Sequence, residues 1–191
     1  MSYLRERLSF FPWMLIPGFI YYLGKARDAD FDSILFVLVL EFVVILRVID
    51  DFACFDYDRR MGKERAYLQG EKKTLALAIL PLAGILVLLS LLALDEKRLI
   101  MTGVFLGLHV PIYLVLRAKP AIVAVSRAKY PFLFYVVASQ TEQQQWWWPV
   151  AGTLFFLVRE ALEEIMNLRS QSAEVLVAIG LVLAKYLTET L

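Results

Sequence analysis

A long apolar run that ends in a cluster of acids constrains this chain more than any other feature. Residues 34–48 read ILFVLVLEFVVILRV, and Asp50, Asp51, Asp56 and Asp58 follow within ten residues. A helix on the surface of a soluble protein alternates an apolar stripe with a charged face, and this run has no charged face. Its length approaches the roughly 17 to 25 residues that cross a hydrocarbon core of about 30 Å. The run therefore predicts a membrane helix with a charged end.

Similar apolar segments recur along the whole chain, in which 60% of the 191 residues are hydrophobic. The candidate spans are residues 10–23, 34–48, 75–94, 100–116, 121–138, 147–158 (continuing towards 166) and 175–187. The fifth carries Arg127 and Lys129, whose charges must face protein or water. No Ser-rich linker or internal repeat marks a boundary. We therefore expect an all-α integral membrane protein of about seven transmembrane helices, forming one domain over residues 1–191.

The distribution of basic residues predicts the orientation of these spans. With seven spans, only Lys25, Arg27, Lys97 and Arg98 fall on one side, whereas Lys185 lies inside the last span and the other fifteen bases share the opposite side with the N-terminus. The positive-inside rule then predicts a cytoplasmic N-terminus and cytoplasmic acidic loops. The QQQWWW run at residues 143–148 would lie on the far side as an interfacial anchor, or alternatively as an aromatic wall against a ligand.

The acid cluster has two interpretations. One is a solvated loop in which the acids and the bases that follow neutralise one another. The other is a cation site, because Asp51 and Asp58 are seven residues apart and share one helix face. Carboxylate oxygens favour Mg²⁺, which binds through one or two carboxylates plus substrate phosphates. With a single cysteine, Cys54, and a single histidine, His109, the chain cannot build a disulfide, a thiolate cage or a histidine metal site.

The stretch at residues 47–70 resembles the first aspartate-rich motif of the UbiA-type intramembrane prenyltransferases, commonly NDxxDxxxD. Laid on that pattern without gaps, Asp50 takes the Asn place and Asp51 the first Asp. Cys54 stands at the second Asp and Asp58 at the third.

The residues around this motif extend the resemblance. Arg65 and Gly70 fall where the family has the Arg of a PxRP-like element and a Gly. A subgroup written roughly R-x-x-D-E-F-K-D-x-E-x-D places its Glu at Asp56, and its first helix is similar to LRERLSFFPWMLIPG. After the sixth span, FFLVREALEEIMNLRSQ is similar to the family's second motif, R-E-x-x-K-D-x-E-D-x-x-x-D. Its Arg and Glu match Arg159 and Glu160, and Glu164 takes its first Asp place.

The resemblance implies a helical bundle around a central cavity, in which Mg²⁺ held by both acidic motifs assists transfer of an isoprenyl group from a polyprenyl diphosphate to an aromatic or other lipid-soluble acceptor. It assigns the catalytic roles to Asp51, Asp58 and Glu164. It makes the metal ligands Asp50, Asp51, Asp56, Asp58, Glu160, Glu164 and Asn167. It gives diphosphate binding to Lys63, Arg65, Lys72 and Arg159. Membrane lipids would surround the bundle, and we expect no nucleic-acid partner.

Three departures from the family pattern favour an alternative. Sulfur at Cys54 is a poor Mg²⁺ ligand, Asn167 and Gln171 replace acids of the second motif, and the family usually has nine spans. The alternative is a catalytically degenerate UbiA-like subunit that binds lipid or scaffolds a larger complex, as a homo-oligomer or with a partner membrane subunit. A CDP-alcohol phosphatidyltransferase would need a DGxxAR string, which this sequence lacks.

Two polar residues inside the predicted spans have structural and functional interpretations as well. Glu41 would form either a contact between helices or part of the acceptor pocket. His109 would make a buried hydrogen bond or contact the substrate.

Overall fold

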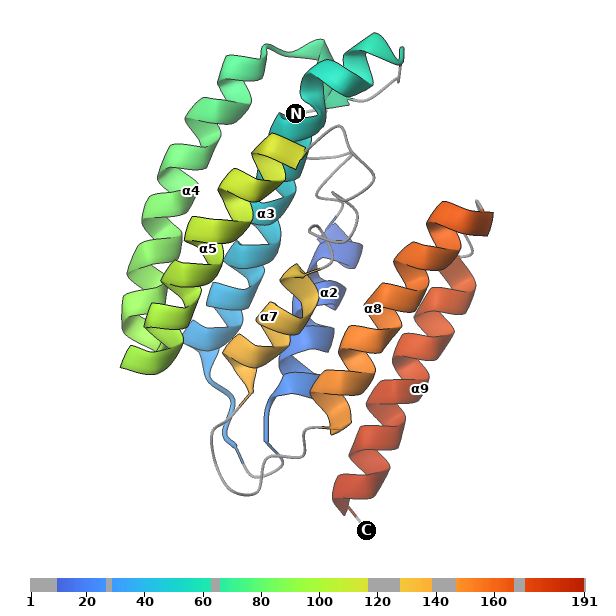
Figure 1. The fold of residues 1–191 in the computed structure, drawn as a ribbon. Helices are drawn as coiled ribbons and strands as arrows, with labels where there is room; N and C mark the ends of the chain where they lie inside the picture. The colour runs from blue at the N-terminus through green and yellow to red at the C-terminus, as the bar shows by residue number, and fades with distance from the viewer. Residues whose placement is uncertain are drawn as a thin grey trace. The chain divides into compact units, whose positions relative to one another are not determined.

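The computed structural model describes residues 10–26, 29–62, 66–116, 128–138, 147–166 and 171–190. All regular structure in these residues is helical, which confirms the all-α prediction (Figure 1). The elements are α2 (Phe10–Gly24), α3 (Ser33–Arg60), the 3-10 helix η1 (Ala66–Gln69), α4 (Lys72–Ala93), α5 (Glu96–Leu116), α7 (Lys129–Val137), α8 (Trp147–Met166) and α9 (Gln171–Thr190).

Two of the described helices are long and apolar enough to cross a membrane. They are α4 and residues Glu96–Val115 of α5, and Leu15–Gly24 forms a shorter apolar helix. The outer surface of both long helices is apolar. The exposed residues include Leu77, Leu80, Val87, Leu88, Leu91 and Leu92 on α4, and Ile100, Val104, Leu108 and Val115 on α5. An apolar surface of this extent indicates contact with lipid or with another protein.

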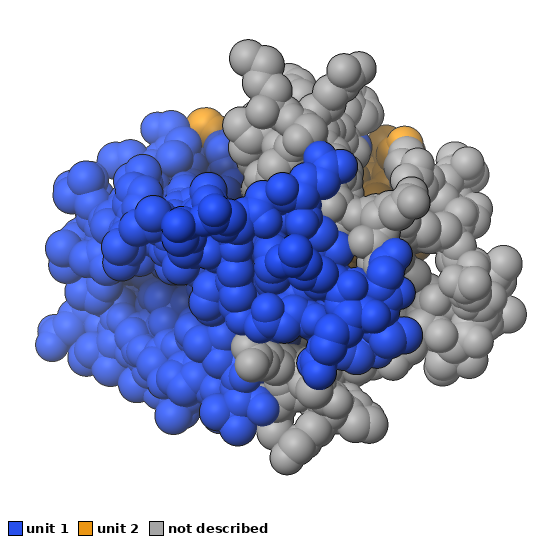
Figure 2. Space-filling model, turned by 90° about the horizontal axis from the view of Figure 1, so that it is seen from above, with its two compact units in different colours: residues 1–17, 32–126 blue, residues 18–31, 127–191 orange. Residues whose placement is uncertain are grey.

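The chain folds as two compact units, which Figure 2 shows in different colours. The first unit takes residues 1–17 and 32–126, and the second takes residues 18–31 and 127–191. The second unit is therefore assembled from two segments that lie far apart in the sequence.

Helix α3 is the central element of the first unit. It begins at an N-cap, where Asp32 accepts a hydrogen bond from the backbone N–H of Leu35 at 2.9 Å. It ends where Gly62 adopts a left-handed φ of 65°, which lets the chain leave the helix without a Cβ clash. The apolar run predicted over residues 34–48 thus continues as a single helix through all four aspartates.

The charged end of α3 packs on one side against η1 and α4. Val48, Phe55, Tyr67 and Leu75 form a buried core there, with Phe52 and other apolar residues packed against it. In Figure 1, α4 starts beside this end of α3 and leads away from it, and α5 returns towards it. The topology therefore brings the ends of three helices and η1 to the place where the acids lie.

The second unit is held together by aromatic packing and by the buried side chain of Lys185. The rings of Tyr130 and Phe156 stack with their centroids 4.3 Å apart. Gly152 lets α8 approach α7 closely, since a Cβ at this position would lie 2.2 Å from the ring of Phe134. The Lys185 side chain is 1% exposed and donates to backbone carbonyl oxygens at the end of α2.

Candidate functional site

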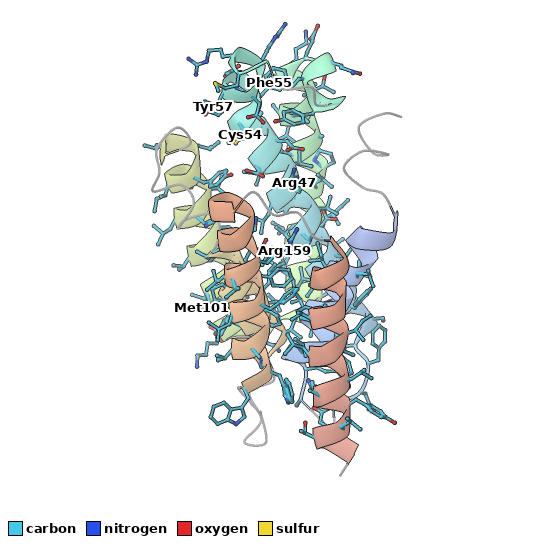
Figure 3. The ribbon with its side chains drawn as sticks, turned by 90° about the vertical axis from the view of Figure 1, so that its right-hand side faces the viewer. Arg47, Cys54, Phe55, Tyr57, Met101 and Arg159 are labelled. Atoms are coloured by element: carbon cyan, nitrogen blue, oxygen red, sulfur yellow. The ribbon has the colours of Figure 1, made fainter. Side chains whose placement is uncertain are left out.

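The four aspartates lie along the last three turns of α3. Cys54, Phe55 and Tyr57 mark this end in Figure 3, and Arg47 lies further back along the same helix. Asp51 is 2% exposed and Asp58 is 7% exposed, so the two carboxylates predicted to share a helix face are both buried. Because α3 continues through both residues, their spacing of seven places them on one face of the helix, as the sequence predicts.

Arg47 contacts two of the aspartates at once. Its Nη1 atom lies 3.3 Å from Oδ2 of Asp50, and its Nη2 atom lies 3.5 Å from Oδ1 of Asp51. The Asp51 side chain is 3% exposed, whereas those of Arg47 and Asp50 are 33% and 29% exposed. A carboxylate as deeply buried as that of Asp51 needs a nearby cation or hydrogen-bond donors, and Arg47 meets part of that need.

Asp50 also contacts α5. The hydroxyl of Tyr113 donates a hydrogen bond to Oδ1 of Asp50, and the Sγ atom of Cys54 lies 3.8 Å from the same oxygen. His109 stacks on Tyr113 with ring centroids 5.9 Å apart, and on Phe105 at 4.7 Å. A row of aromatic rings on α5 therefore leads to the acid cluster.

Cys54 is a protonated thiol in this environment. Burial, followed by the negative charges of Asp50 and Asp58, raises the pKa of its thiol to about 11. At neutral pH the residue therefore offers a thiol, not the thiolate that binds metals.

Asp58 faces η1. The hydroxyl of Tyr67 donates a hydrogen bond to its Oδ2 atom, and the Tyr67 ring packs against Phe55 with centroids 6.1 Å apart. Both partners are buried. This contact holds η1 against the end of α3.

Asp56 forms an ion pair with Lys72, one of the residues predicted to bind the diphosphate. Nζ of Lys72 forms an ion pair with Oδ2 of Asp56 and lies 5.0 Å from the centre of the Phe52 ring. The Asp56 side chain is 52% exposed, so water screens this pair more strongly than the buried contacts.

The donor set at this end has the right chemistry for Mg²⁺, because Asp51 and Asp58 offer buried carboxylate oxygens. These carboxylates are not arranged to surround a metal ion. Among the residues that the structure describes, no group of three or more His, Cys, Asp or Glu side chains is placed to hold a metal ion. Each of the four aspartates instead contacts an arginine, a lysine or a tyrosine.

The remaining predicted site residues belong to other parts of the chain. Lys63, Arg65 and Asn167 lie outside the described residues. The backbones of Arg159, Glu160 and Glu164 form part of α8 in the second unit. The Arg159 side chain is half-buried, whereas the side chains of Glu160 and Glu164 lie outside the description.

Sequence reasoning missed the three side chains that hold the acids. Arg47 precedes Asp50 and Asp51 by three and four residues, and this helix spacing is a usable signal for ion pairs. Tyr113 is 63 residues from Asp50, and Tyr67 is nine residues from Asp58 beyond the end of the helix. Neither tyrosine could have been found without the tertiary structure.

Three polar side chains inside the first unit bury an oxygen atom that has no hydrogen-bond partner among the described residues. These atoms are Oε1 of Glu41, Oγ of Ser90 and Oγ1 of Thr102. They lie on α3, α4 and α5, respectively.

Comparisons with protein-family models, curated proteins and solved structures find no match to this chain. The family resemblance at residues 47–70 therefore stays a prediction.

Proposed function

We propose that the protein is a multi-pass membrane protein of the UbiA type that binds a polyprenyl diphosphate at the charged end of α3 and transfers its isoprenyl group to an aromatic or other lipid-soluble acceptor. One observation carries the proposal: two aspartates two turns apart on one face of a long apolar helix are both buried, at 2% and 7% exposure, and Asp56 between them pairs with Lys72, the first residue of α4. Buried carboxylates are costly unless paired, so such a pair marks a candidate functional site.

The membrane part of the proposal is a bundle of about seven helices around a central cavity. The apolar outer surfaces of α4 and α5 support it, and so does the concentration of basic residues on one side of the predicted topology. In this arrangement the N-terminus and the acidic ends are cytoplasmic, membrane lipids cover the outside, and the prenyl tail lies among apolar side chains.

The reaction breaks the bond between C1 of the allylic chain and the diphosphate oxygen, which keeps the electron pair. The acceptor forms a bond to C1 and loses a proton. Asp51 and Asp58 would hold Mg²⁺, which when bound would supply positive charge against the growing charge of the leaving group. Lys72, the first residue of α4, would attract the same diphosphate, since its ion pair with Asp56 is exposed.

Ligand binding by the full chain in mild detergent tests this proposal. Radiolabelled geranylgeranyl diphosphate should bind with Mg²⁺ and be released by a chelator. Asp51→Asn and Asp58→Asn should each weaken binding by about tenfold or more, because each removes one unit of negative charge beside the cation. Asp58→Asn keeps an oxygen that accepts from Tyr67, so its effect reports charge and not loss of the η1 contact.

Two further variants make the test sharper. Cys54→Asp should tighten binding, because it replaces sulfur with a hard oxygen ligand. Asp95→Asn serves as the control, since this acid precedes α5 and pairs with Arg98 away from α3's charged end. Equal binding by all of these proteins would sink the assignment of the diphosphate site to α3.

The alternative is a noncatalytic subunit that binds lipid or scaffolds a complex, either as a homo-oligomer or with a partner membrane protein. It is favoured by the finding that protein groups already contact all four aspartates. In that case the prenyl diphosphate would bind without regard to Mg²⁺, or not at all. Purification in mild detergent would then recover the same partner, or a second copy of the chain, in constant ratio.

A further inference from the structure

Glu41 lies on the face of α3 that packs against α4. Val48, Phe52 and Phe55 follow it about two, three and four turns later, so the four residues share one face of the helix. These three belong to, or pack against, the buried core that α3 shares with Leu75 of α4. The Glu41 side chain is partly buried, and its Oε1 atom has no hydrogen-bond partner among the described residues. Glu41 therefore places a polar oxygen in a largely apolar interface.

Ser90 occupies the matching face of α4. It follows Leu86 by about one turn and Ile79 by about three turns, and Ile79 packs against the same core. Ser90 is 3% exposed, yet its Oγ atom has no hydrogen-bond partner within the part of the chain that the structure describes. A buried oxygen without a partner costs free energy, and an ordered water is a common way in which folded proteins satisfy such a group.

Glu41 and Ser90 lie at nearly the same level of the helix pair. Helices α3 and α4 run antiparallel and pack along each other (Figure 1). Val48 and Leu82 take part in the same apolar contact between them. From that contact, Glu41 lies about 10 Å back along α3 and Ser90 lies about 12 Å further along α4, at 1.5 Å per residue. Because side chains lean towards the N-terminus of their own helix, these two lean towards each other.

We propose that one water molecule bridges Oε1 of Glu41 and Oγ of Ser90 inside the α3–α4 interface. A single water can donate to the carboxyl oxygen and exchange a hydrogen bond with the hydroxyl, so it satisfies both atoms at once. Polar contacts of this kind hold helices together in a membrane, where the surrounding lipid is as apolar as the side chains. The bridge fixes α4 against α3 about two turns beyond their apolar core. It is independent of the diphosphate site proposed at the other end of α3.

A double-mutant cycle in the full chain tests the bridge through the folding equilibrium constant in detergent. Ser90→Ala should lower this constant about fivefold in the wild-type background, because the water loses one of its partners. In a Glu41→Leu background the water is already lost, and Ser90→Ala should change the constant by less than about twofold. In a Glu41→Gln background, where an amide oxygen still binds the water, the loss of about fivefold should return. Thr102→Val on α5 is the control and should have the same effect in all three backgrounds.

An experimental density map of the protein in lipid supplies the direct observation. It should show a water within hydrogen-bond distance of both oxygens. A direct hydrogen bond between Glu41 and Ser90, or density without a water between them, would overturn the inference. So would equal losses from Ser90→Ala in the wild-type and Glu41→Leu backgrounds. If Glu41→Leu does not fold, the density alone decides the question.

Discussion

The Nζ atom of Lys185 lies 2.6 Å from the carbonyl oxygen of Tyr22, which joins α9 to the end of α2 within the second unit. The same ammonium group donates to the carbonyl oxygens of Lys25 at 2.7 Å and Leu23 at 3.3 Å. The last carbonyls of a helix have no partner within the helix and carry its negative dipole end. A buried lysine from another helix therefore caps α2, and Glu189 at 3.5 Å balances part of its charge.

Lys185→Met should destabilise the fold by about 2–4 kcal/mol, because it leaves buried carbonyl oxygens without donors while preserving most of the side-chain volume. The measurement is the free energy of unfolding in detergent, followed by helical circular dichroism. Lys73→Met is the control, since Lys73 is 77% exposed and pairs with Glu71 on the surface. The control should change stability by less than about 0.5 kcal/mol. Similar losses in both variants would contradict the capping role.

The contact between α7 and α8 makes a second prediction. Gly152→Ala should destabilise the protein by about 1–3 kcal/mol, because the added Cβ would meet three carbon atoms of the Phe134 ring at 2.2–2.9 Å. Gly180→Ala on α9 meets nothing within 4 Å and should stabilise its helix by about 0.5–1 kcal/mol. Thermal unfolding of the two variants in parallel gives the comparison. A stabilised Gly152→Ala would show that α7 and α8 do not approach as closely as described.

The buried hydroxyl of Thr102 leads to a prediction that its replacement will stabilise the protein. Thr102 is 3% exposed and its Oγ1 atom has no hydrogen-bond partner among the described residues. Thr102→Val keeps the shape and removes the buried polar group, so it should raise the unfolding free energy by about 1 kcal/mol. Thr188→Val, which loses a 2.9 Å hydrogen bond to the Lys185 carbonyl oxygen, should show no such gain. Destabilisation by Thr102→Val would mean that the hydroxyl has a partner.

The raised pKa of the Cys54 thiol predicts how the stability of the protein and the reactivity of this thiol depend on pH. Its pKa of about 11 lies above the ordinary thiol value near 9, so the folded state holds this proton more strongly than the unfolded state does. The resulting stabilisation is present below about pH 9 and is lost as the pH rises through 11.

The reactivity of the same thiol provides the measurement. At pH 8, iodoacetamide should modify native Cys54 roughly a hundredfold more slowly than unfolded protein, because the thiolate fraction follows the two-unit difference in pKa. Asp50→Asn removes one of the charges that raise this pKa and should speed the reaction. As Cys54 is the only cysteine, the label reports a single site. A native rate equal to the unfolded rate would contradict the burial.

The sequence was most informative about features that lie within a single helix. Apolar runs predicted α4 and α5 closely, because length and composition alone determine where such helices lie. The shared face of Asp51 and Asp58 followed from helix spacing and needed only that α3 continue through both.

The contacts that Tyr67 and Tyr113 make with the acid cluster could not be predicted from helix periodicity. Whether Asp58 binds a cation or accepts a hydrogen bond depends on how η1 folds back, and whether Asp50 meets Tyr113 depends on how α5 packs against α3. Both are tertiary outcomes that periodicity does not encode. Capping of α2 by Lys185 is a contact of the same kind, since the two residues involved are separated by almost the whole chain.

The division of the second unit between residues 18–31 and 127–191 sets an order of events during synthesis. At about 5–20 residues per second, the ribosome needs several seconds to produce the intervening residues 32–126, which belong to the first unit. Throughout this time the carbonyl oxygens at the end of α2 exist without Lys185. A nascent chain released before α9 is made would lack the donor for these oxygens. The second unit can therefore complete its fold only after α9 has been synthesised.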